Sequence, residues 1–240
     1  MALSHSPKIV TDGLVLCLDA GDGKSYSGSG STWIDRSGKS YNATLVNSPS
    51  IVDGAFDFST NEYADITINS SSTPELVPVD EDFSVEIAYK FANTSARQKF
   101  LGTGNYGRGG WNLGIGYSNF NEIGFAGYND QCDDGTNCRY NRGNVSYAIT
   151  LDTTSFWHII ITYNMTDLYT RMYINGNLVK SQYDSTRGTG SNTNGQFRIG
   201  RTSQGGWGSK KGYCKFVRFY NRSLSTDEAI QNYNAVKGKL

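Results

Sequence analysis

The chain has 240 residues and carries 22 Lys plus Arg against 22 Asp plus Glu, so its formal net charge is zero. This balance excludes a basic surface of the kind that nucleic-acid binding needs. No apolar run reaches the length of a membrane-spanning helix, which excludes that class as well. Glycine is abundant at 28 residues, proline is scarce at 4, and aromatic residues make up 13%. Such a composition favours an all-β fold of many short strands joined by polar turns.

Residues 1–10 show no periodic pattern, and we interpret them as an N-terminal arm. Residues 11–240 contain no internal repeat or linker and are predicted to form one domain. The segment Met1–Pro7 lacks the apolar core of a secretory signal, so we expect the protein to be made in a cytoplasm. Two interpretations of the arm stay open. It either anchors the domain to a neighbouring subunit or extends the first strand at a sheet edge.

The first two thirds of the chain alternates short apolar runs with Gly, Ser, Asn and Asp turns. The clearest run, 82–90, places Phe83, Val85, Ile87 and Tyr89 on one face. We interpret its other face as an outward polar surface. Strands are expected at 14–18, 42–46, 56–58, 63–68, 82–90, 111–117, 122–128 and 145–149.

The stretch 156–200 has the strongest strand signals. Alternation over 157–163 puts aromatic and branched residues on both faces, which indicates a central strand that could face a second layer. Asn175-Gly176 suits the two positive φ angles of a type I′ turn and predicts a hairpin. A closing strand follows at 216–220. The run 224–236 is predicted to be helical, capped by Ser225 or Thr226.

These segments together resemble a known family. Five segments carry the resemblance. They are the strand that begins at Trp157, the strand that ends at Asn175-Gly176, the strand that ends at Arg198-Ile199-Gly200, the segment Gly54-Ala55-Phe56-Asp57-Phe58 with Asn61-Glu62-Tyr63, and the closing segment 216–225. In this order they are similar to laminin-G-like, concanavalin-type domains. The resemblance runs from about residue 13 to 233, and it implies an antiparallel jelly-roll β-sandwich of two sheets with one short C-terminal helix.

A second resemblance concerns the opening of the chain. The run 19–38, which includes Trp33-Ile34-Asp35-Arg36-Ser37-Gly38, resembles the openings of laminin-G-like proteins of tailed bacteriophages. It implies a non-enzymatic virion protein, a decoration or fibre component that is oligomeric on the particle. Its partners would be other virion proteins, such as capsid or tail proteins, and glycans of the host surface. The alternatives are a free carbohydrate-binding lectin-like module and, third, a glycoside hydrolase.

The hydrolase alternative needs two close carboxylates. In enzymes of this fold they often lie on one strand, spaced as Glu-x-Asp-x-x-Glu, and this chain lacks that motif. Asp82 and Glu86 come nearest, and Glu122 has no acidic neighbour on its strand. His158 lies among core residues and has no Ser or Cys motif beside it, so we interpret it as structural. We therefore expect no catalytic residues.

Oxygen-bearing residues suggest where calcium would bind. Asp19 and Asp22 follow the first strand, and a second group of acidic and amide residues follows the strand 56–58. The resemblance implies a calcium site at Asp19, Asp57, Asn61 and Glu62, with Asp65 nearby. The family's adjacent Asp pair is here Asn61-Glu62, and the other interpretation is that these residues only form turns.

Aromatic residues beside Gly- and Asn-rich loops are candidates for stacking on sugars. They are Trp111, Tyr117, Tyr128, Tyr140 and Trp207. The alternative is that they pack inside the sandwich, as we expect for Trp33 and Trp157.

The four cysteines fall into two pairs. Cys132 and Cys138 enclose a small turn and are a candidate disulfide in an oxidising medium. Cys17 and Cys214 lie on the predicted first and last strands. They are either neighbours across these strands or two separate buried thiols.

Overall fold

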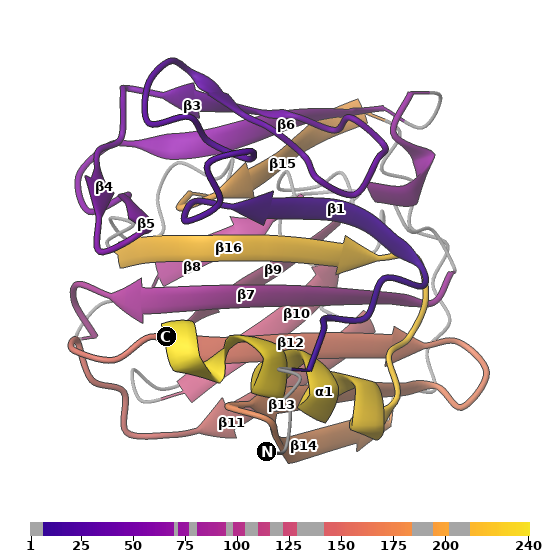
Figure 1. Cartoon of the computed structure of the whole chain (residues 1–240). Coiled ribbons are helices and arrows are strands. Elements are labelled where there is room, and N and C mark those ends of the chain that lie inside the picture. Colours follow the sequence, from indigo (N-terminus) through magenta and orange to yellow (C-terminus); the bar gives the residue numbers. More distant parts are fainter. Residues whose placement is uncertain are drawn as a thin grey trace, which may run out of the picture.

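Two antiparallel sheets pack face to face and enclose the core between them (Figure 1). The computed structural model describes residues 7–69, 72–76, 81–94, 98–103, 110–115, 122–128, 142–183, 194–201 and 212–240. Within these residues the expected jelly-roll sandwich with one C-terminal helix is confirmed. No helix in the described ranges is long and apolar enough to cross a bilayer.

The first sheet has the strand order β14-β13-β12-β7-β16-β5-β4, and β1 also pairs with β16. Two strands share one edge of β16, because its first residues pair with β5 and its later ones with β1. The members are β1 (Leu14–Asp19), β4 (Ile51–Val52), β5 (Ala55–Asp57), β7 (Phe83–Phe91), β12 (Trp157–Asn164), β13 (Tyr169–Ile174), β14 (Asn177–Tyr183) and β16 (Gly212–Tyr220).

The second sheet has the order β11-β10-β9-β8-β15-β6-β3-β2. Its members are β2 (Thr32–Trp33), β3 (Ala43–Val46), β6 (Tyr63–Asn69), β8 (Gln98–Gly102), β9 (Gly110–Ile115), β10 (Glu122–Tyr128), β11 (Arg142–Ala148) and β15 (Asn194–Ile199). Two short 3₁₀ turns, η1 (Pro74–Leu76) and η2 (Lys237–Lys239), complete the described elements. The predicted strands are present with shifts of a few residues at their ends. Strands β2, β4 and β8 were not predicted, the first two because they are very short. Strand β14 is the second strand of the predicted hairpin.

Aromatic rings from both sheets meet in the core. Phe83 of β7 and Phe219 of β16 stack with centroids 5.6 Å apart and planes 2° apart. Trp111 of β9 packs against both, at 6.2 and 6.1 Å. Such large buried rings dominate core energetics, so these contacts join the two sheets. Trp33 is fully buried as expected, whereas Trp157 is half-buried at the margin of the core.

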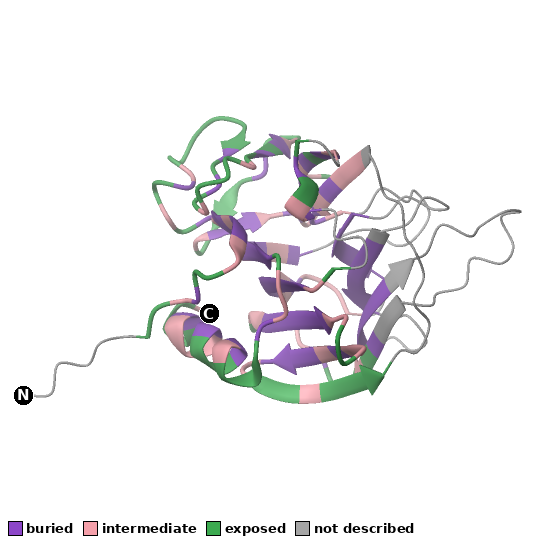
Figure 2. Ribbon diagram, turned by 90° about the vertical axis from the view of Figure 1, so that its right-hand side faces the viewer, coloured by how far each residue is buried: buried purple, intermediate pink, exposed green. Residues whose placement is uncertain are grey.

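The helix α1 (Thr226–Val236) lies across the outer face of the first sheet, over β12 and β13 (Figure 1). It is the second layer that the two-sided apolar pattern of β12 predicted. Ser225 caps it: its hydroxyl accepts from the Glu228 amide, and the Glu228 carboxylate accepts from the Ser225 amide. Strand β14, at the edge of the same sheet, is exposed along nearly its whole length (Figure 2).

The described part of the arm docks on α1. The Val10 amide donates to Asn232 at 2.7 Å, the Val10 carbonyl accepts from Tyr220, and the Lys8 carbonyl accepts from Gln231. Residues 7–11 are not part of a strand, so the edge-extension interpretation is wrong for this segment. The backbone groups of Lys8 and Val10 are bound by side chains of α1 and by Tyr220, rather than by a neighbouring strand.

The opening segment contains a buried carboxylate clamp at Asp35. Its Oδ1 accepts from the amides of Cys17 and Ser37, and its Oδ2 accepts from the Ser37 hydroxyl and the Tyr41 amide. Four donors on one buried carboxylate fix the chain between β1 and β3. Asp35 therefore has a structural role in the opening segment.

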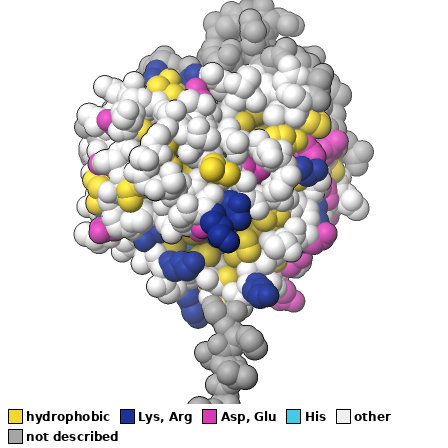
Figure 3. Space-filling model, turned by 45° about the horizontal axis from the view of Figure 1, so that its top comes forward, with side chains coloured by type: hydrophobic (Ala, Val, Ile, Leu, Met, Phe, Trp, Pro, Cys, Tyr) yellow, Lys and Arg dark blue, Asp and Glu magenta, His cyan; other side chains and the backbone are white. Residues whose placement is uncertain are grey.

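The surface mixes charges of both signs with neutral side chains (Figure 3), as the zero net charge leads one to expect. No single-sign field covers the face that the figure shows.

The Asn175-Gly176 turn is confirmed, with φ of 49° and 78°. Gly176 is also pressed against α1, since an added Cβ would lie 2.5 Å from Cδ1 of Tyr233. The helix therefore rests directly on the hairpin turn. Two separate constraints, positive φ and close packing, require glycine here.

We expect Gly176→Ala to destabilise more than Gly54→Ala. Gly54 follows Asp53 in a similar turn, with φ of 69°, but an added Cβ there meets no atom within 4 Å. Positive φ alone costs about 1–2 kcal/mol, and overpacking costs about 1–3 kcal/mol more. Equilibrium unfolding of both variants measures the difference. Equal losses would show that Tyr233 does not pack on the turn.

Candidate functional site

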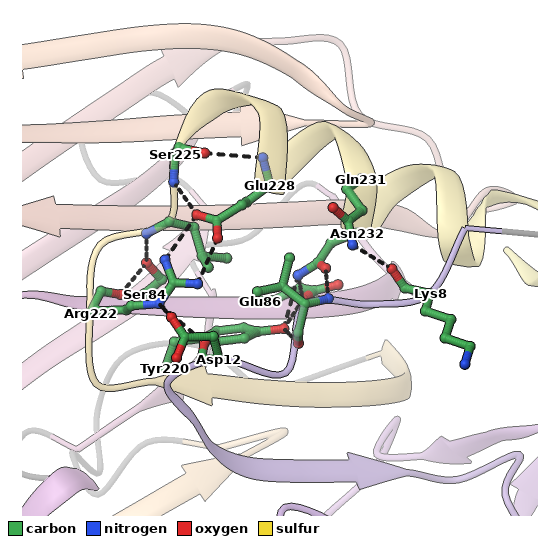
Figure 4. A network of polar contacts seen from close by, with 12 residues as sticks. Lys8, Asp12, Ser84, Glu86, Tyr220, Arg222, Ser225, Glu228, Gln231 and Asn232 are labelled. Atoms are coloured by element: carbon green, nitrogen blue, oxygen red, sulfur yellow. Dashed lines mark hydrogen bonds and ion pairs between the residues drawn. The ribbon is translucent and has the colours of Figure 1, made fainter.

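A buried carboxylate, Glu86, lies under α1 on the outer face of the first sheet (Figure 4). Its Oε1 accepts from Nη1 of Arg218 at 2.6 Å and lies 2.8 Å from Nε2 of His158. Its Oε2 accepts from Nδ2 of Asn232 at 2.8 Å and from the Tyr220 hydroxyl at 3.4 Å. The prediction of an outward polar face on this strand is wrong, because α1 covers it. The prediction that His158 is structural agrees with this position.

Sheet register and helix spacing bring these groups together. Glu86 is directly opposite Arg218 on β16. On β12, Ile160 pairs with Glu86, and His158 is two residues before Ile160 and therefore on the same face of the sheet. Asn232 is one of the buried residues of α1, with Ala229 and Val236 three and four positions away. That i, i+3, i+7 spacing in 229–236 was the sequence signal that α1 has a buried face containing an amide.

The electrostatics of the cluster keep Glu86 ionised. Burial alone would raise the pKa of Glu86, but Arg218 and the hydrogen bonds from His158 and Asn232 outweigh burial, and the pKa lies below its ordinary value. Burial would lower the pKa of Arg218, yet Glu86 holds it above its usual range. A fully buried carboxylate with all its partners in place can neither reach a substrate nor give up a proton. It supports the fold.

The other acidic candidates are also engaged. Asp82 accepts from the Met165 amide at 2.6 Å and so holds the β12–β13 turn against the start of β7. Glu122 is buried at the start of β10. Asp82 and Glu86 thus point to the same face, but Asp82 binds the β12–β13 turn and Glu86 binds Asn232 of α1.

The predicted calcium ligands form local turns. Asp19 accepts from the Gly21 amide, Asp57 from Ser59, and Glu62 from Thr60. The Asn61 carbonyl accepts from the Asn47 side chain, and Asp65 pairs with Arg198 at 2.9 Å. In the part of the chain that is described, no three His, Cys, Asp or Glu residues gather as a metal site would require. Calcium binding here stays a prediction.

The aromatic residues predicted to bind sugars lie in different parts of the structure. Trp111 is 4% exposed and stacks in the core, so its assignment to an exposed sugar platform is wrong. Its side of β9 faces the other sheet, which alternation alone could not reveal. Tyr128 ends β10, with its side chain outside the described part. Tyr117, Tyr140 and Trp207 lie outside the described residues, as do Cys132 and Cys138.

The other two cysteines are separate thiols. Strands β1 and β16 are neighbours, but the register places Cys17 opposite Arg218 rather than Cys214. Burial raises the pKa of both thiols. The interpretation as separate buried thiols agrees with this register, although Cys17 is only partly buried.

A pair of aromatic rings, one exposed and one half-buried, lies instead on the hairpin. Tyr169 of β13 and Tyr183 of β14 are directly opposite each other, with ring centroids 5.5 Å apart. Tyr183 is 51% exposed. The guanidinium of Arg171 lies 5.1 Å from the Tyr169 ring and is paired with Asp167 at 2.5 Å. We call these four residues the tyrosine platform.

Residues 58–230, more than two thirds of the chain, match the Laminin_G_3 family, described as the concanavalin A-like lectin/glucanases superfamily. The chain belongs to this superfamily. No curated relative matches the sequence.

Solved structures with the superfamily fold resemble the chain at low identity. The botulinum neurotoxin serotype D binding domain has a TM-score of 0.66 at 16% identity, over 93% of this chain and 52% of that one. A botulinum neurotoxin DC binding domain in complex with rat synaptotagmin II gives 0.64 at 16%, over 95% and 52%. Trypanosoma rangeli sialidase in complex with sialic acid gives 0.66 at 17%, over 98% and 36%. The chain spans about half of the toxin domains and about a third of the sialidase, and the likeness shows the fold alone.

We expect the stability that Glu86 supplies to depend on pH. Because its folded pKa is lowered, that contribution is fully present above the ordinary value of 4.5 and is lost as pH falls through the folded value. Glu86→Gln, which leaves Arg218 buried without its partner, should cost about 3–5 kcal/mol at neutral pH. The gap between the melting temperatures of wild type and variant should therefore shrink below pH 4.5.

Asp53→Asn, at an exposed carboxylate, is the control and should keep a constant gap to wild type. If Glu86→Gln does not fold, Asn232→Ala removes one donor to the same carboxylate and should give a smaller gap. A gap that stays constant with pH for the Glu86 or Asn232 variant would contradict an ionised, paired Glu86.

Proposed function

We propose that the chain is a non-enzymatic binding module and that its ligand is a glycan held on the tyrosine platform. The observation that carries this proposal is the pair of opposed rings, Tyr169 and Tyr183, of which Tyr183 is half exposed. Two neighbouring rings on a rigid hairpin offer a flat apolar surface matching the C–H face of a sugar. The strand pairing holds the rings in register, so little entropy is lost on binding.

Polar groups border the platform. Arg171 and Asp167 provide charged donors and acceptors beside the Tyr169 ring. A site of stacking rings with a few convergent polar groups suits a sugar, whose edges are hydroxyl-rich.

The absence of catalysis is part of the proposal. Hydrolysis of a glycosidic bond needs an accessible acid and a second accessible carboxylate. Glu86 is buried with four polar partners, and Asp82 is bound to a backbone amide. Among the described residues, these are the two carboxylates that come nearest to the catalytic motif, and their engagement supports the proposal.

We further propose that the module is carried on a phage virion as a decoration or fibre-type protein, made in the host cytoplasm and oligomeric on the particle. Its partners would be capsid or tail proteins. The resemblance of the opening segment 19–38 to laminin-G-like proteins of tailed bacteriophages supports this. The second candidate is a free lectin, favoured by the same platform. Mass spectrometry of purified virions separates the two, because only the first places the chain in the particle.

We expect Tyr183→Ala and Tyr169→Ala each to weaken glycan binding about tenfold or more, since stacked rings are worth about 0.5–1.5 kcal/mol beyond the area that they bury. A glycan array identifies the sugar, and calorimetry compares the variants. Leu178→Ala is the control, because Leu178 is 46% exposed on the same strand and lies outside the platform. No array hit for wild type, or unchanged binding by both tyrosine variants, would contradict the platform.

A further inference from the structure

A second group of aromatic and basic residues lies at the other end of the first sheet. Tyr213 of β16 is directly opposite Lys90 of β7 on one side and Asp57 of β5 on the other. Phe156 precedes the Trp157 that pairs with Tyr89, so it continues the same row across the sheet. Phe156, Lys90 and Tyr213 are half-buried. The row lies roughly 25 Å from the tyrosine platform along β7, at about 3.3 Å per residue.

Two ammonium groups converge on this row. Nζ of Lys90 lies 4.6 Å from the Tyr213 ring centroid and 5.1 Å from that of Phe156. Nζ of Lys215 lies 4.5 Å from the same Phe156 ring. Lys215 is the extra residue of a β-bulge, since the pairing of β16 with β7 shifts between Cys214 and Phe216. Bulges re-aim side chains, and they are common beside functional sites.

Within the described part of the chain, neither lysine forms a direct ion pair with a carboxylate. Among the described residues, Nζ of Lys215 donates to the Asp53 carbonyl at 3.1 Å. Burial lowers the pKa of Lys215, and Lys90 adds to this effect, while Asp53 and Asp19 partly oppose it. Like charges that are half-buried together are costly for the fold, which is typical of a binding site.

We propose that Lys90, Lys215, Phe156 and Tyr213 form a subsite for an acidic sugar. The carboxylate or sulfate of the sugar binds the two ammonium groups, and its apolar face contacts the exposed parts of the two rings. A negative charge between Lys90 and Lys215 relieves their repulsion and replaces lost hydration with charge-assisted hydrogen bonds. The subsite is independent of the tyrosine platform, so it extends the proposed function without depending on it.

The combination of groups decides the class of ligand. A bare inorganic anion would bind the ammonium groups but make no apolar contact with the two rings. A neutral sugar would contact the rings and bring no negative charge to the two ammonium groups. A sugar with an acidic group uses both, and the small size of the cluster fits one residue of a glycan.

Calorimetry with matched probes tests this subsite. Digalacturonate carries a carboxylate at C6, its neutral digalactose counterpart carries a hydroxymethyl group there, and galactose 6-sulfate carries a sulfate. We expect wild type to bind at least one acidic probe and to bind it at least tenfold tighter than the neutral one. Lys90→Gln and Lys215→Gln should each weaken binding of that probe tenfold or more, and so should added salt.

The control is Lys180→Gln, which removes an exposed lysine on β14 and makes the same change in net charge. It should bind the acidic probe as wild type does. No binding of any acidic probe, or unchanged binding by both subsite variants, overturns the proposal. Inorganic sulfate that binds as tightly as the acidic sugar also overturns it, because the rings then contribute nothing. If Tyr183→Ala loses binding of the acidic probe while the Lys90 and Lys215 variants keep it, the probe binds at the tyrosine platform and the proposed subsite is refuted.

Discussion

The buried ion pair between Glu86 and Arg218 is the interaction on which the outer layer of the protein depends. Each charge would be costly alone, and the pair becomes tolerable only because His158, Asn232 and Tyr220 supply further hydrogen bonds. Asn232 belongs to α1 and also receives the Val10 amide. One carboxylate thereby connects the central strands, the C-terminal helix and the docked arm. Nothing in this arrangement leaves Glu86 free for chemistry.

This division of roles explains where binding surfaces can lie. The helix and arm cover the middle of the outer face of the first sheet, and the described polar groups beneath them bind one another. At either end of that face, beyond the helix, lie aromatic rings with charged neighbours: the tyrosine platform at one end and the Lys90–Lys215 row at the other. A rigid sandwich with recognition groups at the margins of a covered face suits a binding module.

Local patterns predicted the strands, the Asn175-Gly176 hairpin and the capped helix, because each depends on neighbours in sequence. They did not reveal that α1 covers Glu86 or that Trp111 points into the core, since both depend on distant packing. To predict the tyrosine platform, one would also have to know of a β-bulge. Without the β-bulge between Met172 and Tyr173, Tyr169 would lie opposite Gln182, and Tyr183 would point to the other face. The residue pattern of these two strands does not predict such a one-residue shift in register.

Native-state hydrogen exchange of wild type and Glu86→Gln tests the central claim most directly, because it reports each amide separately. The arrangement described here predicts that the Val10 amide and the amides of α1 lose protection in the variant, while those of β9 and β10 in the second sheet keep most of theirs. Equal protection of Val10 and α1 in both proteins would contradict a helix and arm held in place by the buried carboxylate.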